Sequence, residues 1–237
     1  MLVRLDKFLT EAKVGSRSEV KNYIKKGLVS VNGIPALKPE TKIETKKDKV
    51  EYQGEVIAEK RFVYYMLNKP KGVVSATVDN VNQTVVSLIK EKYQDELFPV
   101  GRLDKDTEGL LLLTNDGQLA HDLLSPKKHV DKTYYALIRG YVTNSEVEKF
   151  KEGLDIGEKK PTMPADLSIL QPGDVSEIQV TICEGKFHQV KRMFQAVDKE
   201  VIYLKRISMG RLNLDKNLQP GEYRQLSESE IQMLKEK

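Results

Sequence analysis

One carboxylate in this 237-residue chain stands where side chains that do covalent chemistry are often found. Asp104 follows a segment that contains Pro99 and Gly101, and it precedes four leucines at residues 110–113. The leucines predict a short buried strand, which the Asn-Asp-Gly turn at residues 115–117 ends. Asp104 would then lie on a loop held by a rigid core strand. An ionised carboxylate there can attack a substrate carbon and later leave, although an aspartate beside a turn is more often only a turn residue.

Three further segments carry side chains capable of chemistry. Residues 67–72 (Leu-Asn-Lys-Pro-Lys-Gly) form, taken alone, an ordinary basic turn. Lys132 and Tyr134 make a Lys-x-Tyr pattern, in which a strand tyrosine is more often a packing residue. Residues 184–194 (Glu-Gly-Lys-Phe-His-Gln-Val-Lys-Arg-Met-Phe) predict an exposed amphipathic helix with basic residues. Each segment therefore has a plain structural explanation by itself.

Taken in order over residues 62–211, these segments and the one around Asp104 resemble the motifs of the ribosomal pseudouridine synthases. Residues 101–111 match the pattern Gly-Arg-Leu-Asp-x-x-Thr-x-Gly-Leu-Leu without a gap. The length of that match makes it the strongest part of the resemblance. The resemblance implies an enzyme that cuts the N1–C1′ bond of a uridine in RNA, turns the base and rejoins it through C5. That reaction needs no metal, redox partner or high-energy donor, so no cofactor is expected.

The resemblance implies a role for each of four residues. Asp104 would be the nucleophile, attacking C1′ of the ribose or C6 of the uracil. Tyr134 would stack near the uracil and take the C5 proton, with help from its environment or a water because a phenol is a weak base. Lys191, where related synthases often have Arg, would pair with Asp104 and keep it ionised. Arg102 would fill the space that the target base leaves in the RNA stack.

Other functions fit parts of the sequence. Residues 129–134 and 161–165 make the chain most similar to the small-subunit type, which favours 16S over 23S ribosomal RNA as the substrate. A non-catalytic RNA-binding assembly factor would leave Asp104 and Lys191 dispensable. A glycosidase-like hydrolase would use Asp104 and Asp106, about 7 Å apart along a strand. That third function leaves the Lys-x-Tyr segment and the basic segments unexplained.

Positive charge is concentrated at the start of the chain. Residues 1–48 carry 11 Lys and Arg against 6 Asp and Glu, and the totals of 39 and 35 leave 28 against 29 for the remainder. This asymmetry indicates a part that binds a polyanion, attached to a nearly neutral body.

The basic segment has the pattern of a small folded module. Apolar residues at 5, 8, 9 and 12 predict one helix, and the capping box at residues 16–19 begins a second that ends at Gly27. Residues 28–34 predict a hairpin with an Asn-Gly turn. This order is similar to the S4 RNA-binding domain. The similarity implies that four basic residues contact RNA: Arg4, Arg17, Lys21 and Lys25. The last three follow one another at a spacing of four along one helix face.

We expect an α+β fold with an S4 domain at residues 1–58, a linker at 59–61 and a synthase domain at 62–237. Strands are predicted at 62–67, 133–138 and 177–183, and short helices at 85–89, 119–124 and 145–150. Because several strands follow one another without a helix after each, the synthase domain should contain a mainly antiparallel mixed sheet with flanking helices.

Composition narrows the class of protein. The chain has 39% hydrophobic and 31% charged residues, no run of about 18 apolar residues and no apolar secretory leader. Cys183 is the sole cysteine, and the three histidines (121, 129 and 188) lack metal-ligand spacing, so we expect structural or exposed histidines and no metal. No glycine-rich phosphate loop is present. The expected protein is a cytoplasmic monomer without membrane contact, whose partner is ribosomal RNA in a partly assembled small subunit.

Overall fold

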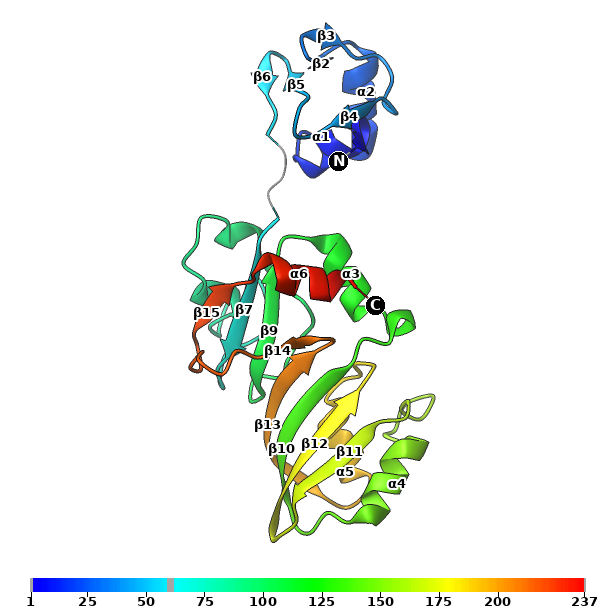
Figure 1. Ribbon diagram of the computed structural model, residues 1–237, viewed down its shortest axis with the longest axis vertical. Coiled ribbons are helices and arrows are strands. Elements are labelled where there is room, and N and C mark those ends of the chain that lie inside the picture. The colour runs from blue at the N-terminus through cyan, green and yellow to red at the C-terminus, as the bar shows by residue number, and fades with distance from the viewer. Residues whose placement is uncertain (1, 59–61, 237) are drawn as a thin grey trace. The chain divides into compact units, whose positions relative to one another are not determined.

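The computed structural model describes residues 2–58 and 62–236. The chain divides into two compact units, one on each side of residues 59–61 (Figure 1). The predicted linker at residues 59–61 lies outside the described residues. Each unit has a hydrophobic core of its own.

The first unit contains two helices and six short strands. In chain order these are β1 Leu2–Arg4, α1 Leu5–Glu11, α2 Arg17–Lys25, β2 Val29–Val31, β3 Ile34–Pro35, β4 Lys42–Glu44, β5 Val50–Tyr52 and β6 Glu55–Val56. β1 pairs antiparallel with β4, and the other strands form an antiparallel sheet in the order β3-β2-β5-β6. The predicted capping box of Ser16 and Glu19 begins α2. The predicted hairpin turn is also present, with positive φ at Asn32 and Gly33.

The second unit is built on one large sheet. Its strands are β7 Tyr64–Lys69, β8 Phe98–Pro99, β9 Glu108–Thr114, β10 Lys132–Arg139, β11 Asp166–Gln171, β12 Val175–Ile182, β13 Glu200–Met209, β14 Leu212–Asn213 and β15 Tyr223–Gln225. Its α-helices are α3 Gly117–Leu124, α4 Asn144–Glu152, α5 Gln189–Gln195 and α6 Glu228–Lys235. Three 3-10 helices lie at Val86–Leu88, Gln94–Glu96 and Pro126–Lys128.

The sheet runs in the order β11-β12-β10-β13-β9-β7-β15, with β14 beside β13 and β8 beside β9. Every pairing in it is antiparallel except that of β9 with β13. The predicted α+β class with a mainly antiparallel mixed sheet is therefore confirmed. The helix predicted at residues 85–89 is only a 3-10 turn, because the β-branched pair Val85 and Val86 disfavours an α-helix.

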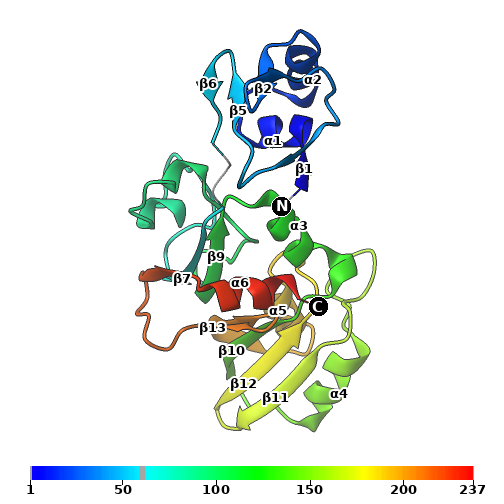
Figure 2. The same ribbon diagram turned by 45° about the horizontal axis from the view of Figure 1, so that its top comes forward.

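The leucine run occupies the centre of the sheet. Leu111 and Leu113 belong to the core on one face, which α4 and α5 cover, and Leu110 and Leu112 belong to the core on the other face, which α3 and α6 cover. Figures 1 and 2 show α6 crossing the sheet near β7 and β9. Because both faces of β9 are covered, the strand is continuously apolar rather than alternating.

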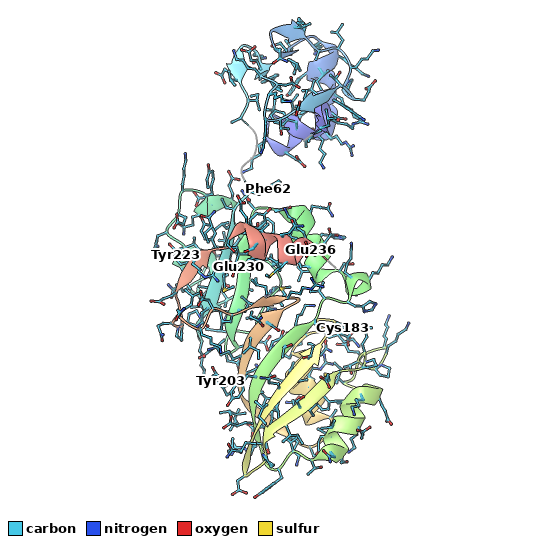
Figure 3. All side chains as sticks on the ribbon, in the orientation of Figure 1. Phe62, Cys183, Tyr203, Tyr223, Glu230 and Glu236 are labelled. Atoms are coloured by element: carbon cyan, nitrogen blue, oxygen red, sulfur yellow. The ribbon has the colours of Figure 1, made fainter. Side chains whose placement is uncertain are left out.

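β9 and β13 meet over two residue pairs, Glu108 with Lys205 and Gly109 with Arg206. We call this contact the parallel seam. Gly109 has φ +99°, and a Cβ there would lie 2.2 Å from the Arg206 carbonyl oxygen, so only glycine fits. Tyr203 on β13, labelled in Figure 3, donates its hydroxyl hydrogen to Glu108 Oε2 at 2.8 Å. The seam joins the β7–β9 part of the sheet to the β10–β13 part.

Candidate active site

The loop that carries Asp104 leads into β9 and is held by hydrogen bonds close to the carboxylate. The Asp104 carbonyl accepts from the Thr107 amide at 3.1 Å, which closes a turn. The Ser75 hydroxyl accepts from the Leu103 amide at 3.1 Å and donates to the Leu103 carbonyl at 2.9 Å. The loop therefore holds Asp104 before any substrate binds.

Lys69 supports the same loop from inside the protein. It ends β7 with no solvent exposure, and its ammonium donates to the carbonyls of Thr107 at 2.9 Å, Pro70 at 3.1 Å and Lys105 at 3.4 Å. Burial lowers the pKa of Lys69 to about 8, although nearby carboxylates oppose that shift. Lys69 in the segment 67–72 is thus a buried structural cation, and not part of an exposed basic turn.

Lys191 on α5 contacts two carboxylates of the loop. Its Nζ lies 3.1 Å from Asp104 Oδ2 and 2.6 Å from Asp106 Oδ1. Burial lowers the pKa of Lys191, but the hydrogen bonds to Asp106 and Asp104 outweigh it and hold that pKa above its ordinary value. The structure thus brings the two predicted partners together. Asp106, which the sequence suggests only as the second carboxylate of a hydrolase, shares the cation with Asp104.

A buried glutamine fixes the segment that leads into α5. Gln189 accepts from the Lys186 amide at 2.9 Å and donates to Glu184 Oε1 at 3.0 Å, with only 4% of its surface exposed. Glu184 Oε1 also accepts from the Met163 amide at 2.8 Å. These bonds explain the spacing of Glu and Gln in residues 184–189. They place the first turn of α5, and Lys191 with it, against the Asp104 loop.

His188 adds an imidazole beside the same carboxylate. Its Nε2 lies 3.6 Å from Asp104 Oδ1. The residue precedes α5 with φ 49° in the left-handed region, and its ring stacks on Phe187 with centroids 3.8 Å apart. Phe187 is 73% exposed. The sequence pattern indicates no role for His188 in the site, because spacing does not reveal the left-handed backbone that places its ring beside Asp104.

A cleft of about 640 Å³ is lined by Asp104, His188 and Lys191. Tyr134, which is buried, lies on β10 in the wall of the cleft, and Arg102, which is exposed, lines it from the loop before Asp104. Lys132 shares the buried face of β10 with Tyr134, and Arg206 lies opposite Tyr134 on β13. All the predicted residues of this site therefore line one cleft, together with Lys132 of the Lys-x-Tyr pattern and the unpredicted cation Arg206.

The predicted RNA-binding residues of the first unit lie at its surface. Arg17, Lys21 and Lys25 are exposed on α2, in agreement with the predicted cationic face. Arg4 is also exposed, but it binds the buried Asp6 carboxylate through Nε at 3.0 Å and Nη2 at 2.8 Å. This ion pair lowers the pKa of Asp6 and ties Arg4 to the start of α1.

Within residues 2–58 and 62–236, no group of three or more His, Cys, Asp or Glu side chains is placed to hold a metal ion. In the same residues, no helix is long and apolar enough to cross a membrane. Cys183 is a free, half-buried thiol.

Two family models match the chain. Residues 63–196 match the model described as RNA pseudouridylate synthase, and residues 3–50 match the model of the S4 domain. The first match contains the cleft residues Asp104, Tyr134 and Lys191. The second contains the four predicted RNA-binding residues of the first unit.

Full-length relatives show the same similarity. A Bacillus subtilis protein named uncharacterized RNA pseudouridine synthase YtzG is 48% identical over 99% of each chain. Ribosomal small subunit pseudouridine synthase A of Vibrio vulnificus is 42% identical over 97% of this chain and 98% of its own. Ribosomal large subunit pseudouridine synthase B of Bacillus subtilis is 40% identical over 98% of this chain and 95% of its own. A crystal structure of a pseudouridylate synthase has 38% identity and a TM-score of 0.70, covering 98% of this chain and 99% of the other.

Proposed function

The chain belongs to the RNA pseudouridine synthase family, and from this premise we propose that it isomerises one uridine of ribosomal RNA with Asp104 as the nucleophile. The observation that carries the proposal is the contact of Lys191 Nζ with Asp104 Oδ2 at 3.1 Å in the cleft. A cation at that distance favours the ionised carboxylate, which is the nucleophilic form. The hydrogen bonds of the Asp104 and Leu103 backbone hold the loop that carries the carboxylate, which favours a fixed orientation of the nucleophile.

The target base has to leave the RNA stack to reach Asp104. Tyr134 in the cleft wall would stack against the uracil and take the C5 proton. Arg102 is exposed on the loop before Asp104 and would fill the space that the base vacates. Phe187, exposed and stacked on His188, offers an aromatic surface for a base next to the target. The cleft thus has groups for the reacting nucleotide and for its neighbours.

We propose 16S ribosomal RNA as the substrate, within a partly assembled small subunit. The similarity to the small-subunit synthase of Vibrio vulnificus supports this choice, and the 40% identity to the large-subunit synthase makes 23S RNA the alternative. Arg17, Lys21 and Lys25 would hold the RNA backbone without reading bases. We propose a monomer, since one chain supplies all the residues assigned to the cleft.

A hydrolase that uses Asp104 and Asp106 fits the site poorly. Such an enzyme needs one carboxylic acid that stays protonated to donate to the leaving group. Burial raises the pKa of Asp106, but the hydrogen bond from Lys191 outweighs it and lowers that pKa below the ordinary value. Asp106 is therefore held in the form that cannot act as the acid.

The test is tritium release from ribosomal RNA labelled at C5 of uridine, with wild type compared with Asp104→Asn. Small-subunit and large-subunit RNA are assayed separately, each with and without early-binding ribosomal proteins. We expect release by wild type on small-subunit RNA, none by Asp104→Asn, and similar RNA binding by both. The near-isosteric Asp106→Asn is the matched control and should retain activity.

Three other outcomes would each reject a different part of the proposed function. Wild-type turnover by Asp104→Asn would reject the nucleophile assignment. Release only on large-subunit RNA would reject the proposed target and keep the reaction. Tight binding without release on any RNA would favour the non-catalytic assembly factor.

A further inference from the structure

The cleft contains two buried polar side-chain atoms that lack a hydrogen-bond partner among the described residues, Arg206 Nη2 and Thr107 Oγ1. Arg206 is only 3% exposed, and its Nε donates to the Leu110 carbonyl at 2.8 Å. A buried guanidinium nitrogen without an acceptor carries an uncompensated desolvation cost. The unpaired donor therefore indicates an acceptor that arrives with the substrate.

A second buried cation lies near Arg206. Lys132 is 7% exposed and donates to the Val130 carbonyl at 2.6 Å. Burial lowers its pKa, and so does the positive charge of Arg206. Among the described residues, neither cation forms an ion pair with a carboxylate. Asp131 partly offsets the charge of Lys132, but two buried cations without an ion-paired carboxylate still favour negative charge between them.

The sheet places both cations beside the expected position of the base. Arg206 is paired in register with Tyr134, and Lys132 lies two residues before Tyr134 on the same buried face of β10. All three line the cleft with Asp104. A uracil stacked on Tyr134 would thus have both cations at its edge and the nucleophile at the ribose side.

Negative charge develops on the uracil ring in either route open to Asp104. If the carboxylate attacks C1′, the N1–C1′ bond breaks with its electron pair on the base, and N1 and the carbonyl oxygens share the charge. If it attacks C6, the ring electrons move to the carbonyl oxygen at C4. In both routes the N1–C1′ bond breaks and C1′ bonds to C5, the carboxylate is released, and the proton lost from C5 balances the one that N1 gains. The isomerisation needs no further reactant.

We propose that Arg206, through Nη2, donates to a carbonyl oxygen of the target uracil and that Arg206 and Lys132 together stabilise the negative charge of the ring. This inference rests on the proposed function and adds two substrate-binding residues to it. Donors fixed where charge develops stabilise the transition state more than the ground state. Loss of Arg206 should therefore slow the chemical step more than it weakens RNA binding.

The experiment measures single-turnover conversion of the target nucleoside, by mass spectrometry of digested RNA, alongside RNA binding. Arg206→Met and Lys132→Met are compared with Lys205→Met, which removes a neighbouring β13 cation that does not line the cleft. We expect about 100-fold slower conversion for Arg206→Met, as for loss of one oxyanion donor. Its RNA affinity should stay close to that of wild type, and Lys205→Met should convert normally.

A second substrate separates the base from the phosphate as the acceptor. Fluorine at C5 withdraws electrons and stabilises negative charge on the ring, but it leaves no C5 proton to lose, so the rate followed on RNA that contains 5-fluorouridine at the target is the disappearance of that nucleoside. Arg206→Met should slow this step by a smaller factor than it slows conversion of uridine. If Arg206 binds phosphate instead, Arg206→Met should slow the reaction of both RNAs by the same factor. RNA binding would then weaken and its salt dependence would fall. That result would overturn the proposal.

Two controls keep the result interpretable. Thermal unfolding reports whether Arg206→Met folds, and if it does not, Arg206→Lys and Lys132→Met on the two RNAs provide the same comparison. Equal rates for wild type and folded Arg206 and Lys132 variants would reject this inference alone. Absence of conversion by wild type would reject the proposed function itself.

Discussion

The ammonium of Lys69 donates to the carbonyl of Thr107 at 2.9 Å and thereby holds the loop of the candidate nucleophile from the interior of the protein. The pKa of Lys69, about 8, lies far below the 10.5 of an ordinary lysine because of burial. Loss of its proton would remove a donor from carbonyls on both sides of Asp106. The support of the loop is therefore sensitive to pH.

We predict that the single-turnover rate of wild type falls with an apparent pKa of about 8 as pH rises. Lys69→Arg, which stays charged, should move this fall to higher pH if the variant folds. Lys71→Met, which removes the exposed neighbouring cation, is the control and should keep the wild-type profile. An unchanged alkaline fall in folded Lys69→Arg would contradict the prediction.

The same group affects stability with a definite sign. Between about pH 8 and 10.5 the unfolded chain retains the Lys69 proton and the folded chain does not. The contribution of Lys69 to the free energy of unfolding should therefore rise with pH across this interval and be constant below it. Denaturant unfolding of wild type and Lys69→Met at several pH values measures this contribution.

Lys191 contacts the carboxylates of both Asp104 and Asp106, so variants of Lys191 and Asp106 should separate the roles of the two carboxylates. Lys191→Met should slow the single-turnover rate, because it removes the cation that lies 3.1 Å from the Asp104 carboxylate and holds it in place. Asp106→Asn leaves Lys191 to Asp104 alone, and the rate should be retained. Lys191→Arg should retain activity through a two-pronged contact. An equal loss of rate in Lys191→Met and Asp106→Asn would show that the two carboxylates act as one unit.

Gly109 should be the glycine least tolerant of a side chain. Gly109→Ala places a Cβ 2.2 Å from the Arg206 carbonyl oxygen, so the parallel seam has to open. We predict a loss of about 3 kcal/mol or more in the free energy of unfolding. Gly221→Ala is the matched control, since φ is +92° there and no atom lies within 4 Å of its Cβ. Similar losses for the two variants would attribute the effect to backbone conformation alone.

Phe187 should contribute to RNA binding through stacking. Phe187→Ala is expected to weaken binding by about 1–3 kcal/mol, the range for one stacked base. The control is Tyr141→Ala, because Tyr141 is 57% exposed and does not line the cleft. A titration with the substrate RNA measures the affinities of both variants and of wild type. Equal affinities for Phe187→Ala and wild type would remove Phe187 from the RNA interface.

The first unit should supply the salt-dependent part of binding. Arg17→Glu combined with Lys21→Glu removes two exposed cations from α2 and should make the slope of log affinity against log salt shallower by about 2. Lys38→Glu combined with Lys46→Glu changes the charge equally and should alter the slope less. An unchanged slope in the first pair would exclude α2 from the interface.

Features encoded by neighbouring residues could be predicted from the sequence. The capping box at Ser16 and the Asn32-Gly33 turn each depend on a few adjacent side chains, and both form as expected. The leucines of β9 form the buried central strand because their run is continuous. Asp104 and Lys191 were paired by resemblance, and the structure places them 3.1 Å apart.

Features set by distant residues could not be predicted. Lys69 and Arg206 are charged, so the sequence favours a surface position, yet carbonyl groups from other segments hold both of them inside. His188 reaches Asp104 only because of its left-handed backbone. The parallel pairing of β9 with β13 has no local signature in a chain whose other described strand pairs are antiparallel.

The parallel seam should also delay the return of activity during refolding. Asp104 belongs to the β7–β9 part of the sheet, whereas Tyr134 and Arg206 belong to the β10–β13 part, and the seam pairs residue 108 with residue 205. Contacts so far apart in sequence form slowly, because closing a long loop costs entropy before any contact is gained. Recovery of activity should therefore lag behind recovery of secondary structure. A chain with both parts folded but not yet joined would hold RNA through residues 2–58 and leave it unmodified.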